Sequence, residues 1–237
     1  MSGPSPLLKA IQDLGNKYPH VRAQAVTALA AALQERGAAP VNEEVRVAVR
    51  CLAEHVHEED EDTAVKACSC LTLTGAAAAA AFPELARACL DKRPAVSMAA
   101  ATALVKLVKL TPVTRRKGVE VLPVVIKGLA ELHDDTLTQL ATILRSLEDE
   151  AAPLINQLVE EFLLPEPQGT MAKLREKVTG HYHKRRQRCF ELLGKVGPAA
   201  EPALPTLRQF VQCSDPWLQQ QAKACIIRIR RSLEESA

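Results

Sequence analysis

The sequence predicts an all-α fold: a right-handed α-solenoid of about six antiparallel helix pairs, forming one continuous domain over residues 1–237. Three observations predict it. A pattern of turn residues and apolar residues recurs along the chain, as in repeat architectures. Apolar residues fall at i, i+3, i+4 and i+7 in every segment, which is the period of an amphipathic helix. Aromatic residues make up only 3% of the chain, too few for a typical β-sandwich.

The recurring unit is a polar turn, then an aliphatic residue, then a small residue, then Leu or Ile at helical spacing. In the first instance, the turn of residues 17–20 leads to Val21, Ala25 and Leu29. The position after each turn is occupied in order by Val21, Val65, Val96, Leu137, Arg185 and Leu218. The steps between these positions are 44, 31, 41, 48 and 33 residues, so the period is that of a two-helix repeat.

Each repeat is expected to place one amphipathic helix before its turn and one after it. The helices before the turns are expected at residues 5–15, 41–56, 78–90, 117–132, 152–164 and 199–212. The repeats are expected at residues 5–36, 41–75, 76–110, 116–148, 152–197 and 199–235. One repeat cannot bury its own apolar face, so neighbouring repeats must stack to form a continuous core.

Proline and glycine mark the ends of these helices. Pro19, Pro94 and Pro216 stand where a first helical turn is expected, and proline suits that position because no N–H is needed there. Five glycines stand near expected helix ends, where a left-handed cap is common. They are Gly15, Gly37, Gly75, Gly194 and Gly197.

The sixth repeat resembles a HEAT repeat. The resemblance rests on Leu193-Gly-Lys-Val-Gly197-Pro-Ala-Ala-Glu-Pro202-Ala-Leu-Pro205-Thr-Leu207, followed by Ser214-Asp-Pro and Leu218-Gln-Gln-Gln-Ala222. The Val21-Arg22 and Asp62/Val65-Lys66 units are similar to the same motif, in which the carboxylate is expected to cap the second helix. The resemblance covers essentially the whole chain and implies a fold more than a function. Arg185 in place of an aliphatic residue, the missing basic residue after Leu137, and an insertion at 165–180 depart from it.

Composition bears on compartment and cofactors. The seven cysteines include no CxxC pair, and most sit among apolar neighbours, so we expect small buried residues and a cytoplasmic protein. No run of apolar residues approaches a membrane span, and the N-terminus lacks a signal peptide. The chain is expected to be complete and monomeric. No cofactor and no metal are expected, because His55-x-His57 ends a helix and has no further ligand cluster at a definable spacing.

Charge is concentrated near the C-terminus. Residues 176–237 carry 11 basic and 6 acidic side chains, although the whole chain has a net charge of only +2. Arg185 and Arg188 share a helix face, as do Arg228 and Arg231. If the second helices of neighbouring repeats are parallel, the two pairs lie side by side and form a basic patch. The patch is either a solubilising face or a docking site for an acidic protein tail or phosphate.

The acidic run His57–Asp62 is read as a solvated turn, with a contact to a basic partner as the alternative.

The leading functional prediction is a non-catalytic scaffold or adaptor that binds another protein through a concave groove or a ridge of turns. No GxGxxG, P-loop or GxSxG motif is present. The repeat number also resembles TOG domains, which implies tubulin binding through the turn ridge. A resemblance to HEAT-like DNA-alkylation glycosylases, or binding of nucleic acid or phosphoinositide, is a further alternative; the near-neutral net charge disfavours nucleic acid. The candidate partner-binding residues are Tyr18, His20, Arg22, Lys92, Arg93, Lys184, Arg185, Arg186, Arg188, Trp217, Arg228 and Arg231.

Overall fold

The computed structural model describes residues 5–37, 40–163 and 181–236. Within these residues every regular element is a helix and none is a strand, which confirms the predicted all-α solenoid class. The chain divides into two compact units, Met1–Val121 and Leu122–Ala237, which we call the first and second units. Helix α7 (Pro112–Lys127) contains the boundary between them. The single continuous domain stays a prediction, and the predicted insertion at 165–180 lies outside the described residues.

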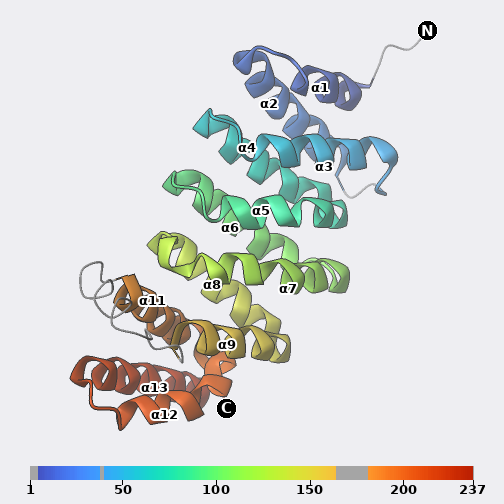
Figure 1. Ribbon diagram of the computed structural model, residues 1–237. Helices are drawn as coiled ribbons and strands as arrows, with labels where there is room; N and C mark the ends of the chain where they lie inside the picture. Colours follow the sequence, from blue (N-terminus) through green and yellow to red (C-terminus); the bar gives the residue numbers. More distant parts are fainter. Residues whose placement is uncertain (1–4, 38–39, 164–180, 237) are drawn as a thin grey trace. The chain divides into compact units, whose positions relative to one another are not determined.

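Three helix pairs precede α7 in the first unit. Helix α1 (Pro6–Leu14) packs on α2 (Pro19–Arg36), α3 (Glu43–His55) on α4 (Glu61–Leu71), and α5 (Phe82–Ala88) on α6 (Pro94–Val108). The 3-10 segment η1 (Thr72–Ala81) joins α4 to α5. The second helices also pack on one another in chain order, α2 on α4 and α4 on α6 (Figure 1). Each pair therefore covers the apolar face of its neighbour, as stacked repeats require.

The second unit repeats this arrangement around α11. Its second helices are α8 (Asp134–Leu147), α11 (His181–Val196) and α13 (Pro216–Ser236), and α11 packs on both of the others. Its first helices are α9 (Ala152–Leu158) and α12 (Leu204–Val211). Short segments connect them, namely η2 (Leu129–Glu131), η3 (Glu148–Ala151), η4 (Val159–Leu163) and η5 (Gly197–Ala203). Helix α11 already begins at His181.

The starts of the second helices follow the predicted punctuation. Pro19, Pro94 and Pro216 are the first residues of α2, α6 and α13, as predicted. The carboxylate of Asp215 accepts hydrogen bonds from the backbone N–H groups of Trp217 (2.9 Å) and Leu218 (3.2 Å), so it caps α13.

The cap expected at Asp62 is wrong by two residues. Asp60 caps α4 and accepts a 2.8 Å hydrogen bond from the Thr63 N–H, whereas Asp62 lies in the first turn and pairs with Lys66 at 2.6 Å. The acidic run offers several carboxylates, and only the residue with extended backbone just before the first turn can reach the free N–H groups.

Several junctions between repeats have a residue with positive φ. Gly37, Gly75 and Gly197 have φ of 58°, 60° and 70°, as their placement predicted. At Gly37 and Gly75 the cap is not left-handed helical, because ψ is −138° and −135°, which matches the first central residue of a type II′ turn. Glu148 adopts the same conformation (φ 53°, ψ −123°) without being glycine.

The positive-φ expectation was wrong for the other two glycines. Gly15 has φ −75°, and Gly194 lies inside α11.

The core is built from small and branched aliphatic side chains. Phe82 and Leu85 of α5 are fully buried, as are Ala64 and Ala67 of α4, whose small size lets the helices approach closely. One helical stretch, Glu61–Ala88, is long and apolar enough to cross a membrane by length and composition. That stretch bends at Gly75, and its parts α4 and α5 pack against α6, so its apolar residues form repeat core.

The cysteines follow the prediction of small buried residues. All seven are free; five are buried, and Cys51 and Cys213 are half-buried. Burial raises the pKa of Cys68 and of Cys70 to about 12, so these thiols are neutral at physiological pH. They therefore behave as small hydrophobic residues of the core.

Candidate functional site: the groove between α8 and α11

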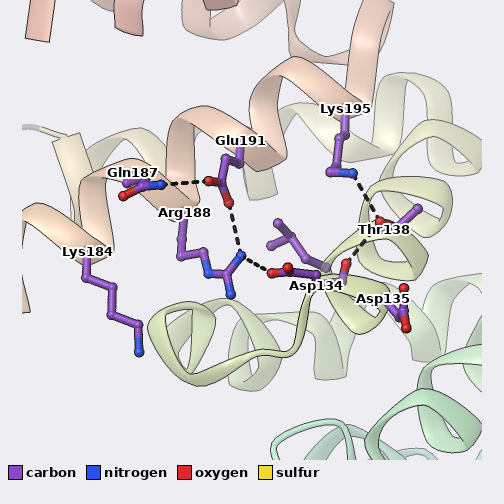
Figure 2. Close-up of a pocket in the computed structure, with 9 residues that line it drawn as sticks. Asp134, Asp135, Thr138, Lys184, Gln187, Arg188, Glu191 and Lys195 are labelled. Carbon is purple, nitrogen blue, oxygen red and sulfur yellow. Dashed lines mark hydrogen bonds and ion pairs between the residues drawn. The ribbon is translucent and has the colours of Figure 1, made fainter. Parts of the chain in front are cut away.

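An open groove of about 590 Å³ lies between α8 and α11 in the second unit (Figure 2). The α8 side contributes two acidic residues and a threonine, and the α11 side contributes three cations, a glutamine and a glutamate. The lining residues are Asp134, Asp135, Leu137, Thr138, Lys184, Gln187, Arg188, Glu191 and Lys195. Both walls are helical, so the side chains project from a rigid frame.

Arg188 is the central residue of the groove. Its Nη1 donates to Asp134 Oδ1 at 2.5 Å and to Glu191 Oε2 at 3.0 Å (Figure 2). Its Nη2 donates to the Leu132 carbonyl oxygen at 3.2 Å. Gln187 donates to the other oxygen of Glu191 at 3.0 Å. One guanidinium therefore joins α11 to the turn that precedes α8.

These contacts shift the pKa values of the pair. The hydrogen bond from Arg188 lowers the pKa of the Asp134 carboxyl below its usual value. Burial alone would lower the pKa of Arg188, but its hydrogen bonds with Asp134 and Glu191 outweigh burial and raise it. The side chain of Asp134 is 84% exposed, so water screens the pair and it stabilises the fold only modestly.

Further along the groove, Lys195 is held by α8. Its Nζ donates to Thr138 Oγ1 at 3.1 Å, and Arg145 Nη2 donates to the Lys195 carbonyl oxygen at 2.5 Å. Lys184 and Asp135 lie at the open side of the groove, exposed to solvent. The walls are therefore held in place by their own contacts, and charged groups remain turned toward water.

Helices α11 and α13 are parallel and in a constant register. The His183 ring lies 3.8 Å from the Trp217 ring, Cys225 Sγ contacts the Phe190 carbonyl oxygen at 3.7 Å, and a Cβ at Gly194 would lie 3.2 Å from Arg228 Cδ. Arg228 is thus level with Gly194, about 9 Å along the axis from Arg188 at 1.5 Å per residue. The expected basic patch is therefore not side by side: it is divided along the helix axes into one group at Arg185 and Arg188 and another at Arg228 and Arg231.

The structure places the other predicted residues of α11 and α13 in packing contacts. Arg186 is buried: its Nη2 donates to the Leu163 carbonyl oxygen at 2.9 Å, and its guanidinium lies 5.5 Å from the Phe210 ring. Arg185 is half-buried, with its guanidinium 4.7 Å from the Phe162 ring. The buried residue at the start of this helix is thus Arg186, where the repeat pattern pointed to Arg185.

Trp217 is half-buried beside His183, and Arg231 is exposed and pairs with Glu235 at 3.0 Å. Partner contact by either residue stays a prediction.

The first and third turns of the predicted turn ridge lie in the first unit, and two cations near them are engaged internally. Arg22 makes a bidentate contact with the Glu58 carboxylate, at 2.9 Å from Nε and 2.5 Å from Nη2. Arg93 pairs with Asp91 at 2.8 Å and donates to the Glu58 carbonyl oxygen at 2.7 Å. The acidic turn read as solvated is therefore partly bound by arginines of the repeats on either side.

The other predicted ridge residues of the first unit are open to solvent. Tyr18, His20 and Lys92 are exposed, and the Tyr18 and His20 rings lie 5.8 Å apart.

The chemistry available to the groove is that of charge pairing and hydrogen bonding. Among residues 5–37, 40–163 and 181–236, no group of three or more His, Cys, Asp or Glu is placed to hold a metal ion. The charged side chains that line the groove can form charge-assisted hydrogen bonds.

Sequence reasoning identified Lys184 and Arg188 but missed several groove residues, including Asp134, Thr138, Glu191 and Lys195. The spacing of Lys184, Arg188, Glu191 and Lys195 at i, i+4, i+7 and i+11 places them on one face of α11 and was a usable signal. The residues of α8 could be found only once the packing of α8 on α11 was known.

Comparison with known proteins supports the fold and gives no family. No family model matches the chain, and no curated protein matches it. Two engineered proteins solved by the Northeast Structural Genomics Consortium are similar in structure, one with a TM-score of 0.53 at 14% identity, covering 97% of this chain and 98% of its own. The other has a TM-score of 0.51 at 16% identity, covering 97% of this chain and all of its own. A designed armadillo repeat protein in complex with a (KR)4 peptide has a TM-score of 0.48 at 14% identity, covering 96% of this chain and 100% of its own. At such low identity, the two likenesses above 0.5 speak to the fold alone.

Proposed function

We propose that this protein is a non-catalytic, HEAT-like scaffold that binds an extended segment of another protein in the groove between α8 and α11. One observation carries the proposal: the groove is open, about 590 Å³ in volume, and lined by charged side chains on two neighbouring helices, α8 and α11. Helices stacked as repeats offer a long surface of regular spacing, which is how repeat proteins bind extended partners.

The internal contacts of the groove favour binding over a purely structural role. Arg188 and Glu191 are fixed by their hydrogen bonds, so ordering them on binding costs little further entropy. Lys184 and Asp135 are exposed and can form new charge-assisted hydrogen bonds with a partner. A fixed wall beside adaptable charges suits recognition of a peptide.

The test is a selection from a random peptide library displayed on phage, carried out with the whole chain. We expect enrichment of peptides that bind the wild type and lose binding to Thr138→Tyr, in which a large ring occupies the groove. Thr27→Tyr is the matched control, because Thr27 and Thr138 are both exposed helix residues whose hydroxyls donate to the carbonyl oxygen four residues earlier. Both variants are checked for helix content and unfolding temperature.

A selection that enriches no peptide contradicts the proposal. So does a set of peptides that bind wild type, Thr138→Tyr and Thr27→Tyr equally, since such peptides do not use the groove. Peptides that are lost with Thr27→Tyr alone would move the binding surface to the first unit.

Tubulin binding through the turn ridge is the second proposal, favoured by the exposure of Tyr18, which is 51% accessible, and of Lys92. It has less support than the groove, because the Arg22 and Arg93 guanidiniums are held by Glu58 and Asp91. Cosedimentation with microtubules that is abolished by Lys92→Glu would favour it.

We also propose a cytoplasmic location, on the ground that the seven cysteines are free.

A further inference from the structure

A second open groove, of about 560 Å³, lies within the second unit and shares no lining residue with the groove between α8 and α11. Its walls come from the end of α8 with η3 and the start of α9, from η5, and from α13. The lining residues are Arg145, Glu148, Asp149, Ala152, Pro198, Ala199, Glu201, Pro202 and Leu233, and we call this surface the acidic groove. The sequence predicted none of these residues to bind a partner.

Three exposed carboxylates, those of Glu148, Asp149 and Glu201, give the acidic groove its charge. In the parts of the chain that the structure describes, none of the three carboxylates forms an ion pair or a side-chain hydrogen bond. Glu148 and Asp149 belong to η3 and Glu201 belongs to η5, and these two segments pack on each other. Like charges are therefore gathered at one place without a counter-ion, and a cationic ligand would relieve their repulsion.

Arg145 is the one cation among the described residues that line the acidic groove. Its Nη2 donates to the Lys195 carbonyl oxygen at 2.5 Å, so its guanidinium is held against the end of α11. With three carboxylates and one guanidinium, the lining residues have a net charge of −2. Arg145 also carries the only side-chain N–H donors among them, because Ala, Pro, Leu and ionised Asp and Glu donate no side-chain hydrogen bond. A matching ligand must therefore supply both positive charge and hydrogen-bond donors.

The other lining side chains of the acidic groove are apolar. Ala152, Pro198, Ala199 and Leu233 are half-buried, and Pro202 is exposed. Proline has no backbone N–H, so Pro198 and Pro202 offer no donor to an anion. Lysine and arginine side chains lay their methylene stems on apolar surface and keep their charged ends in contact with water. Apolar residues beside exposed carboxylates therefore match the two parts of a basic side chain.

The acidic groove does not suit a metal ion. Among the described residues, no group of three or more His, Cys, Asp or Glu is placed to hold one, so the three carboxylates do not converge on a single point. We propose that the acidic groove binds a basic segment of a partner protein. Its lysine or arginine stems lie on Pro198, Pro202 and Leu233, and their charged ends pair with the three carboxylates. This docking surface is separate from the groove of the proposed function and does not depend on it.

The experiment measures the fluorescence anisotropy of a labelled peptide of alternating arginine and glycine, mixed with the full chain at low salt. We expect Glu201→Gln and Asp149→Asn each to weaken binding about two- to fivefold, the size of one exposed charge contact. The matched control is Glu131→Gln, an exposed glutamate of the second unit outside both grooves. Glu59→Gln tests the acidic turn His57–Asp62 as a competing site. Circular dichroism verifies that each variant is folded.

Binding that depends on Glu201 and Asp149, and not on Glu131 or Glu59, supports the inference. No binding to the wild type, or an equal loss with Glu131→Gln, overturns it, because attraction by net charge then accounts for any binding seen. A loss with Glu59→Gln alone assigns the peptide to the acidic turn and also overturns it. So does spermine that binds more tightly than the peptide in calorimetry, since the ligand is then a small polyamine.

The Thr138→Tyr variant keeps the two grooves apart in the test. It fills the groove between α8 and α11 and is expected to leave binding of the basic peptide unchanged. A loss of basic-peptide binding with Thr138→Tyr would move the peptide to that groove and overturn the inference. Failure of the acidic groove in the other measurements leaves the proposed function standing.

Discussion

One junction in each unit has the same backbone conformation but a different residue at the turn. After α4 the chain turns at Gly75, with φ 60° and ψ −135°, and after α8 it turns at Glu148, with φ 53° and ψ −123°. Glycine adopts this conformation freely, whereas a side chain is crowded there. Both junctions lead into a 3-10 segment whose last residue, Ala81 or Ala151, is fully buried. The difference teaches that packing of the next helix, and not the residue at the turn, sets the backbone path.

The largest expected effect is at another junction residue with positive φ, Gly197. Gly197→Ala is expected to destabilise the protein by about 2 kcal/mol, from backbone strain at positive φ together with crowding. Its new Cβ would meet Ser232 at 3.3 Å, whereas a Cβ at Gly75 would meet nothing within 4 Å. Urea unfolding followed by circular dichroism measures both Gly197→Ala and the control Gly75→Ala. If Gly75→Ala costs as much as Gly197→Ala, strain alone accounts for the effect and crowding by Ser232 has no part in it.

A smaller effect of opposite sign is expected at Glu148. Glu148→Gly relieves backbone strain of about 1–3 kcal/mol in the folded state. It also lowers the stability by about 0.5–1 kcal/mol, because glycine raises the conformational entropy of the unfolded chain. The variant is therefore expected to be more stable by about 1 kcal/mol, seen as a higher unfolding temperature. Glu150→Gly in the same segment is the control and is expected to be destabilising. A Glu148→Gly protein less stable than wild type would contradict the comparison with Gly75.

The smallest effect concerns two arginine–carboxylate pairs, Arg22–Glu58 in the first unit and Arg188–Asp134 in the second, and the pH dependence of the stability that they provide. The hydrogen bond from Arg22 lowers the pKa of the Glu58 carboxyl below its ordinary value of 4.5. Its stabilisation is therefore complete above about pH 4.5 and is lost as the pH falls through the lower folded-state pKa. We expect Arg22→Gln to lower the unfolding temperature at pH 7 and to differ little from wild type in strong acid. Thermal unfolding across this pH range measures the difference.

The corresponding variant in the second unit is Arg188→Gln, and its effect is expected to be smaller. The Glu58 side chain is 16% exposed, whereas that of Asp134 is 84% exposed, so solvent screens the second pair more strongly. If the unfolding temperatures of the two variants depend equally on pH, solvent exposure does not determine how strongly each arginine–carboxylate pair stabilises the fold.

The helix pairs could be predicted from sequence because their signals are local. Apolar spacing and the prolines at 19, 94 and 216 place the second helices with little error. The 3-10 segments at the junctions were missed, since stretches such as Ala76–Ala81 carry no local signal that separates a 3-10 turn from an α-helix.

The candidate site was harder to predict, because the fate of a charged side chain depends on the neighbouring repeat. Arg22, Arg93 and Arg188 look alike in sequence as exposed cations, yet each reaches a carboxylate or carbonyl oxygen of an adjacent turn. Arg186 is buried where Lys184, two residues away, is exposed. The register of α11 against α13 decided where Arg228 lies, and no local pattern encodes that register.

The contact from Arg145 to the Lys195 carbonyl oxygen caps the C-terminal end of α11 from a neighbouring helix. A cation at a helix C-terminus satisfies carbonyl groups that have no partner within the helix. An Arg145→Gln variant loses this cap, and the final turn of α11 is then expected to open more often. Amide hydrogen exchange in that turn would rise, while exchange in the middle of the helix would stay unchanged.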